Sequence, residues 1–160
     1  MTNLTIAAEL GERLKAANQT VAVAESSTGG LICAALLAVP GASAYFRGGS
    51  VIYTGISRRE LMGVNADDVR GIEPLTEPMA AHFAKAARAQ LDATWGIAEL
   101  GAAGPTGTRY GHDAGTSVIA VDGPVNLSIT IATGLSDRET NMSRFTEAAI
   151  ELLLRALNDG

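Results

Sequence analysis

The apolar positions of this chain alternate between the spacing typical of helices and short unbroken runs typical of buried strands. Apolar residues recur at helical spacing over residues 6–14, and the apolar run at 21–24 predicts a buried strand. A helix rich in alanine and leucine is expected over residues 31–39. It ends before Pro40, because proline disfavours a helical residue before it. The chain is therefore expected to begin as helix, strand, polar loop and helix.

The same alternation continues to the end of the chain. A helix is expected to start after Thr76, whose hydroxyl suits an N-cap, and to run to about Leu91. A short helix near residues 57–62 and a long C-terminal helix complete the helical elements. The remaining strands are expected at residues 50–54, 94–100, 116–121 and 126–133, the last two joined by a hairpin turn. Crossover units mixed with a hairpin predict a single α/β domain over residues 1–160, a three-layer α/β/α sandwich with a mixed sheet.

Composition narrows the class of protein. The 160 residues, of which 47% are hydrophobic, suffice for one substantial core. A net charge of −5 opposes binding to nucleic acid, which needs clustered basic residues. The sequence contains no apolar run long enough to cross a bilayer and no signal-peptide pattern at its start, so no membrane partner and a cytoplasmic location are expected.

The few cysteine and histidine residues do not suggest a metal site. Cys33 is the single cysteine and has apolar neighbours, which is typical of a small buried residue. His82 and His112 are the two histidines, and they lack the short helical spacing of a zinc motif. We therefore expect neither a metal nor another cofactor.

The polar loop at residues 25–30 is the first candidate site. In open α/β sheets, ligands bind beyond the carboxyl ends of the strands, where a helix N-terminus offers free N–H groups. The loop follows the first predicted strand, and Ser26 and Thr28 supply hydroxyls while Gly29 and Gly30 permit close approach of the backbone. Ordinary capping of the next helix is the alternative interpretation of this segment.

Two further segments are candidates on weaker grounds. The long polar loop at residues 101–113 follows another predicted strand, and it matches neither a P-loop nor a dinucleotide fingerprint. Loops of this length serve a function or are mobile. Ser43 lies in a tight turn over residues 40–49, where it is either a turn residue or a nucleophile.

These three segments, in this order and spacing, resemble the C-terminal domain family of the competence/damage-inducible protein CinA, which includes nicotinamide mononucleotide deamidases. Family members read Ala-Glu-Ser-Cys-Thr-Gly-Gly at residues 24–30 of this chain, Gly-Ser-Ser-Ala-Trp/Tyr-Phe at 41–46, and Gly-Ile-Ala-Gly-Pro at 101–105. The resemblance covers nearly the whole chain. It leads us to expect a stand-alone short form without the family's additional N-terminal domain.

The resemblance implies hydrolysis of the carboxamide of nicotinamide mononucleotide, which gives nicotinic acid mononucleotide and ammonia without a metal. By position, Ser43 is implied as the nucleophile and Tyr53 as a hydrogen-bonding partner or proton relay. Arg138 matches an arginine that the family uses near the ligand, and its guanidinium suits a phosphate. The other implied substrate-binding residues are Ser26, Thr28, Gly29, Gly30, Gly101, Gly104 and His112. The resemblance also implies a pyridine nucleotide as the ligand and a homodimer.

This chain departs from the family pattern at positions that bear on the chemistry. The family has a lysine, the implied base, where this chain has Arg58, and an arginine stays protonated in proteins. Leu100 replaces a threonine or serine of the pocket. His112 lies where relatives often carry a lysine, and it is a base only if its loop folds over Ser43. Two functions therefore remain open: an amidohydrolase, or a pyridine-nucleotide-binding relative that does not hydrolyse its ligand. An interaction module is a third, supported only by the family's name.

Overall fold

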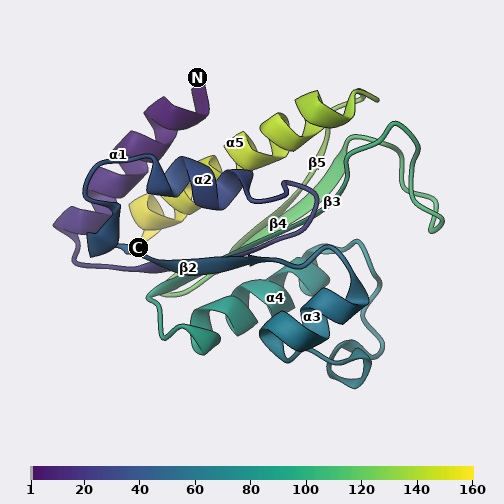
Figure 1. Ribbon diagram of the computed structural model, residues 1–160, viewed down its shortest axis with the longest axis horizontal. Helices are drawn as coiled ribbons and strands as arrows, with labels where there is room; N and C mark the ends of the chain where they lie inside the picture. The colour runs from purple at the N-terminus through teal and green to yellow at the C-terminus, as the bar shows by residue number, and fades with distance from the viewer. Residues whose placement is uncertain (1) are drawn as a thin grey trace.

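Five strands form one mixed sheet in the computed structural model, which describes residues 2–160 (Figure 1). The order across the sheet is β2-β1-β3-β4-β5. The first three strands are parallel, whereas β4 runs antiparallel to both β3 and β5. The strands are β1 (Val21–Glu25), β2 (Phe46–Val51), β3 (Trp95–Ala102), β4 (Thr116–Asp122) and β5 (Leu127–Ala132).

Helices cover both faces of this sheet. One face carries α1, α2 and α5, and the other carries α3 and α4 (Figure 1). The helices are α1 (Thr2–Ala16), α2 (Leu31–Leu37), α3 (Gly55–Met62), α4 (Glu77–Gln90) and α5 (Arg138–Asp159), with 3-10 turns at Ala42–Ala44 and Ala66–Val69. The structure thus confirms the predicted three-layer α/β/α sandwich.

Alternating side chains of the central strands contribute to two separate hydrophobic cores, one on each face of the sheet. Val23 and Ile97 point toward α1, α2 and α5, while Ala98 points toward α4, where Phe83 is fully buried. The α4 side of β3 is lined by small residues, so this helix packs close to the strand backbone. A Cβ at Gly96 would lie only 1.9 Å from the carbonyl oxygen of Ala84 in α4.

The strand expected at residues 50–54 is in fact β2 at Phe46–Val51, so its prediction was wrong for residues 52–54. Gly48 and Gly49 made the strand hard to predict, because glycine weakens the apolar pattern of a strand. Packing explains the pair: a Cβ at Gly49 would lie 2.3 Å from Sγ of Cys33 in α2. Burial, aided by the nearby Glu25 carboxylate, raises the pKa of the Cys33 thiol, which makes it a poor nucleophile.

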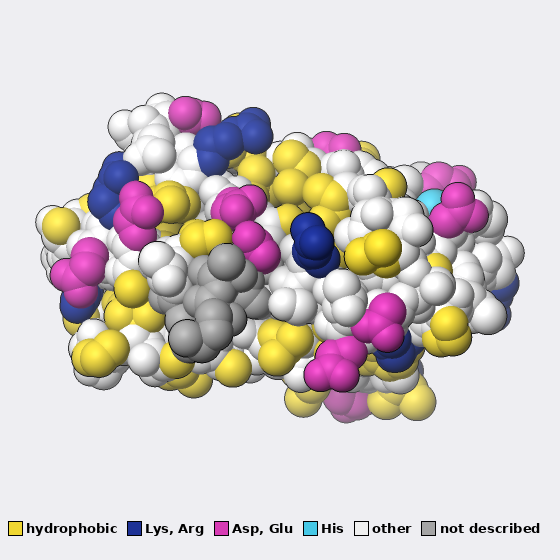
Figure 2. Space-filling view, turned by 90° about the horizontal axis from the view of Figure 1, so that it is seen from above, with side chains coloured by type: hydrophobic (Ala, Val, Ile, Leu, Met, Phe, Trp, Pro, Cys, Tyr) yellow, Lys and Arg dark blue, Asp and Glu magenta, His cyan; other side chains and the backbone are white. Residues whose placement is uncertain are grey.

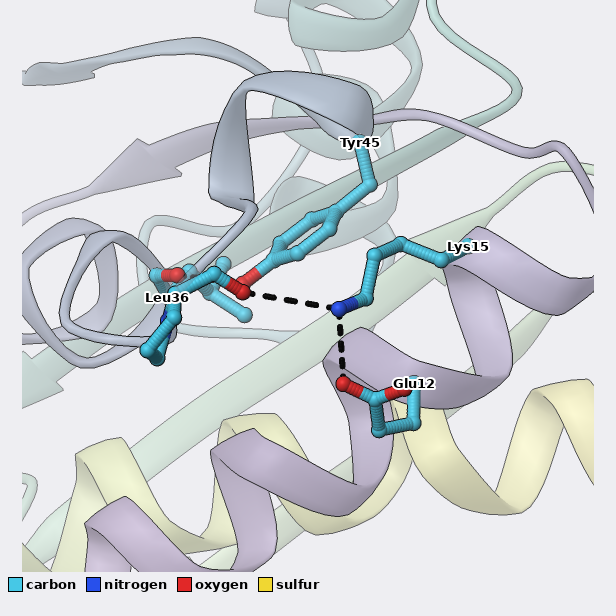
Figure 3. Close-up of polar contacts among 5 residues, drawn as sticks. Glu12, Lys15, Leu36 and Tyr45 are labelled. Atoms are coloured by element: carbon cyan, nitrogen blue, oxygen red, sulfur yellow. Dashed lines mark hydrogen bonds and ion pairs between the residues drawn. The ribbon is translucent and has the colours of Figure 1, made fainter.

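The turn that contains Ser43 is anchored at the start of β2. Tyr45 is fully buried, and its hydroxyl donates to the carbonyl oxygen of Leu36 at 2.5 Å. Beside it, the Lys15 ammonium contacts Glu12 at 2.6 Å (Figure 3). These contacts hold the turn against α1 and α2.

The surface carries charges of both signs. On the face formed by α1, α2 and α5, acidic and basic side chains are interspersed among apolar ones (Figure 2). Across the described residues, no helix combines the length and the apolar character needed to cross a membrane. These residues also contain no group of three His, Cys, Asp or Glu side chains placed to hold a metal ion.

Candidate functional site

A cleft of about 550 Å³ opens beyond the carboxyl ends of β1 and β3. This is the edge of the sheet where ligands of open α/β domains bind. Segments far apart in the chain meet there: the loop after β1, the segment after β2, the start of α3, and the long loop after β3. The lining residues are Ser26, Tyr53, Gly55, Arg58, Pro74, Leu75, Leu100, Gly101, Thr108, Arg109 and Tyr110.

Arg138 joins two walls of the cleft. It is the first residue of α5, whose N-terminus is capped by the Asp137 carboxylate through the N–H of Thr140. One guanidinium nitrogen donates to the carbonyl oxygen of Gly104 at 2.6 Å, and another donates to the Tyr53 hydroxyl at 3.2 Å. Arg138 therefore holds Tyr53 against the loop that follows β3.

Arg58 is a fixed cation on the cleft wall. Its Nε donates to the carbonyl oxygen of Ile52 at 3.2 Å, and its guanidinium lies 5.0 Å from the centre of the Phe83 ring. Burial lowers the pKa of Arg58, yet an arginine remains charged in proteins. The side chain can thus bind an anion but cannot accept a proton.

Ser26 presents a free hydroxyl to the cleft. The residue is only 6% exposed, and its Oγ has no hydrogen-bond partner among the described residues. Its loop neighbours point elsewhere. Thr28 is fully buried, the N–H of Gly30 donates to the Glu25 carboxylate at 2.8 Å, and Gly29 is exposed. Ligand contacts by these three residues remain predictions.

Two buried glutamates organise this loop, and the sequence analysis did not single them out as functional residues. Glu25 ends β1, Glu99 lies beside it in β3, and neither is exposed to solvent. Glu25 accepts the N–H groups at the start of α2, so the expected alternative of capping by a Ser or Thr of this loop is not what the described residues show: the N-cap is Gly30, which makes no side-chain cap. The available signal was a glutamate within an otherwise apolar strand, at the end of β1 for Glu25 and inside β3 for Glu99.

Ser43 lies away from the cleft in a single chain. It is exposed in the turn before β2, whereas Tyr53 follows β2, and the intervening strand spans about 20 Å. Figure 1 shows this turn and the loop after β3 at opposite ends of the molecule. One chain therefore does not bring Ser43 to Tyr53, Arg58 or His112.

The long loop after β3 reaches the cleft through residues other than His112. The His112 ring is held by Thr108, with Nδ1 at 2.9 Å from Oγ1. Arg109 and Tyr110 line the cleft instead, with the guanidinium 5.0 Å from the centre of the tyrosine ring and 2.8 Å from its hydroxyl. A guanidinium next to an aromatic ring within a polar loop was a signal that could have identified them.

An α/β/α sandwich with a cationic, aromatic cleft at the carboxyl ends of its parallel strands makes this chain a single-domain α/β protein with a candidate ligand site. The model of the CinA C-terminal domain matches residues 3–157, and the chain belongs to this family, within the competence/damage-inducible superfamily. Of the predicted site residues, Ser26, Tyr53, Arg58 and Gly101 line the cleft directly, and Arg138 contacts Tyr53 and Gly104.

Proteins of several bacteria resemble this chain. The CinA-like protein of Desulfosudis oleivorans is 35% identical over 96% of the chain, and that of Salinibacter ruber is 33% identical over 98%. The chain spans 38% of the length of each of these relatives. The relative from Synechococcus is 40% identical over 74% of the chain, which spans 28% of its length.

Solved structures share the fold over nearly their whole length. The competence/damage-inducible protein of Agrobacterium tumefaciens is 27% identical, with a TM-score of 0.89 over 99% of this chain and 96% of its own. Competence damage-inducible protein A of Klebsiella pneumoniae is 26% identical, with a TM-score of 0.90 over 98% and 97% of the two chains.

Proposed function

We propose that the cleft binds a pyridine nucleotide, with nicotinamide mononucleotide as the first ligand to test. The observation that carries this proposal is the set of charges and rings around the free Ser26 hydroxyl. Arg58 and Arg109 line the same cleft as Tyr53 and Tyr110. Guanidinium groups suit a phosphate, and aromatic rings suit a flat heterocycle. The family resemblance supports the same class of ligand.

We further propose that the single chain binds this ligand without efficient hydrolysis of its carboxamide. In the amidohydrolase reaction, a nucleophile adds to the amide carbon, the C–N bond breaks, ammonia leaves, and water releases the acid. That route needs a nucleophile beside a proton acceptor. Arg58 stands in the position of the implied base, and Ser43 lies at the far end of β2. Only a second copy of the chain could bring Ser43 to this cleft, as in the homodimer that the resemblance implies.

The amidohydrolase remains the second candidate function, because Ser26, Tyr53 and Arg138 of the implied constellation do meet at the cleft. One experiment separates the two candidates. The purified protein is incubated with nicotinamide mononucleotide, and both ammonia and the melting temperature are measured. Thermal stabilisation with ammonia at the background level supports binding without turnover. Ammonia release that disappears in Ser43→Ala establishes the amidohydrolase instead.

Arg138→Met is expected to weaken the affinity for nicotinamide mononucleotide at least ~10-fold, because a lost charge-assisted hydrogen bond costs on the order of 1.5–3 kcal/mol. The measurement is a titration by calorimetry or thermal shift. Arg155→Met is the matched control, since Arg155 is an exposed arginine near the other end of the same helix. Equal affinities of the two variants would contradict the role of Arg138, and the absence of stabilisation by any pyridine nucleotide would contradict the proposed function.

A further inference from the structure

The buried glutamates lie directly behind the floor of the cleft. Glu25 and Glu99 are register partners on the parallel strands β1 and β3, and both are fully buried. Gly101, which lines the cleft, separates this pair from the ligand space. A Cβ there would lie 2.5 Å from Oγ of Ser27 and 2.7 Å from Oε1 of Glu99. The carboxyl group of Glu99 therefore lies directly behind Gly101, a residue that lines the cleft.

Three backbone N–H groups at the start of α2 point to Glu25. Its two oxygens accept the N–H groups of Gly30 at 2.8 Å, Ile32 at 3.1 Å and Cys33 at 2.9 Å, and the hydroxyl of Thr28 at 2.7 Å. A carboxylate that accepts several backbone N–H groups is stabilised in its charged form. The Thr28 hydroxyl has a single hydrogen, and the shorter contact assigns it to Glu25.

Glu99 then needs a hydrogen of its own. Its Oε2 lies 3.1 Å from Oγ1 of Thr28, whose only hydrogen is directed to Glu25. This contact is a hydrogen bond only if Glu99 donates it. The other oxygen of Glu99 accepts from Ser27 at 2.5 Å, and Ser117 lies 3.1 Å from it. Among the described residues, neither glutamate takes part in an ion pair, and two adjacent buried carboxylates do not both ionise without one.

We propose that Glu99 is a positioning residue of the cleft that acts as a neutral carboxylic acid, sharing one proton with Glu25 through the Thr28 hydroxyl. Its Oε2 also accepts the backbone N–H of Thr28 at 3.0 Å, and it lies 3.3 Å from the nitrogen of Ser26, whose N–H donates to the backbone carbonyl of Glu99 at 3.0 Å. In this way Glu99 fixes the loop that presents the Ser26 hydroxyl to the ligand. The inference rests on the proposed function only for the choice of nicotinamide mononucleotide as the probe.

The pH dependence that follows has a definite sign. Burial raises the pKa of Glu99 despite the hydroxyl groups that oppose the shift. The titratable groups that face it are Glu25 from β1 and, beyond it, Cys33 from α2, while β4 and α5 present Ser117 and Phe145. The native state binds this proton more tightly than the unfolded chain does. The contribution to stability is thus complete below the ordinary carboxyl pKa of about 4.3 and declines as pH rises toward the higher folded pKa.

Glu99→Gln tests the proposal, because an amide supplies both an N–H donor for Thr28 and an oxygen acceptor for Ser27. We expect its melting temperature to stay within ~3 °C of the wild type and its affinity for nicotinamide mononucleotide to stay within about threefold. Its stability should decline less than that of the wild type as pH rises from about 4.3 toward the folded pKa of Glu99. The infrared difference spectrum, wild type minus variant, should show the carbonyl stretch of a protonated carboxyl group at neutral pH.

Glu77→Gln is the matched control. Glu77 is a partly exposed carboxylate that accepts two hydroxyl groups, those of Ser128 and Thr130, both at 2.7 Å. These hydrogen bonds lower its pKa, so it is ionised at neutral pH. Its variant should therefore show no protonated carboxyl band in the infrared difference spectrum, and its affinity for nicotinamide mononucleotide should equal that of the wild type.

Glu99→Ala removes all of these hydrogen bonds and should weaken the affinity for the same ligand more than ~10-fold. If this variant does not fold, the glutamine variant and the infrared band decide the question. The proposal is overturned if the band is missing, or if Glu99→Gln lowers the melting temperature by more than ~8 °C, as expected when an ionised carboxylate is lost. If the wild type shows the infrared band but binds no pyridine nucleotide, the proposed function is refuted and the assignment of the proton to Glu99 stands.

Discussion

Replacing Arg58 by lysine together with Leu100 by threonine is expected to raise ammonia release from nicotinamide mononucleotide by at least ~100-fold, the typical contribution of a positioned general base. The site of Arg58 already lowers the pKa of a cation by burial. A lysine there would lose its proton far more readily than an arginine does. Threonine at position 100 would add a hydroxyl to the cleft wall.

The assay is the initial rate of ammonia release at saturating ligand. Arg58→Met with Leu100→Thr is the matched control, because it keeps the polar wall and removes both the cation and the base. Adding Ser43→Ala to the lysine variant should return the rate to background, since Ser43 of a second copy of the chain is the implied nucleophile at this cleft. A lysine variant no faster than the wild type, yet with unchanged ligand affinity, would show that something other than the base limits the reaction.

Gly96→Ala is expected to lower the free energy of unfolding by about 3 kcal/mol or more, because overpacking at a rigid contact is costly. The added Cβ would meet the carbonyl oxygen of Ala84 at 1.9 Å and Cβ of Arg88 at 2.8 Å. Backbone atoms of a helix cannot move away to relieve this contact, whereas a flexible side chain could. The measurement is unfolding in urea, monitored by circular dichroism.

Gly55→Ala is the control for this substitution. A Cβ at Gly55 would have no neighbour within 4 Å, and the residue opens α3. Alanine is favoured over glycine in a helix by up to about 1 kcal/mol, so this variant should be as stable as the wild type or slightly more stable. Similar losses in both variants would mean that α4 does not pack on β3 as closely as described.

The fold could be predicted from the sequence because its elements carry local signals. The Thr76 cap, the apolar run that became β1 and the turn between β4 and β5 all act over a few residues. The strand β2 was misplaced because its central residues are glycines, which are set by the approach of Cys33 from a distant helix. A local sequence pattern cannot reveal a contact between residues of two separate elements, such as Gly49 and Cys33.

The site was predictable only where position along a strand determines position in space. Ser26 and Gly101 follow or end parallel strands, and both reach the cleft. Ser43 precedes its strand and therefore lies at the other edge of the sheet. Glu99 was missed because its importance comes from hydroxyl groups on two other segments, those of Ser27 and Ser117.

Backbone N–H groups of the loop at residues 25–30 already have hydrogen-bond partners within the protein. The backbone N–H groups of Thr28 and Gly30 donate to the two buried glutamates, and that of Gly29 donates to the carbonyl oxygen of Ser26, before any ligand arrives. Such a loop is pre-organised, so binding does not have to supply the entropy of ordering it. Under the proposed function, side chains of the cleft select the ligand, and selectivity among pyridine nucleotides should depend on Arg109, Tyr110 and the rest of the loop after β3. Exchanging that loop between relatives is therefore the direct test of whether it selects the ligand of the proposed function.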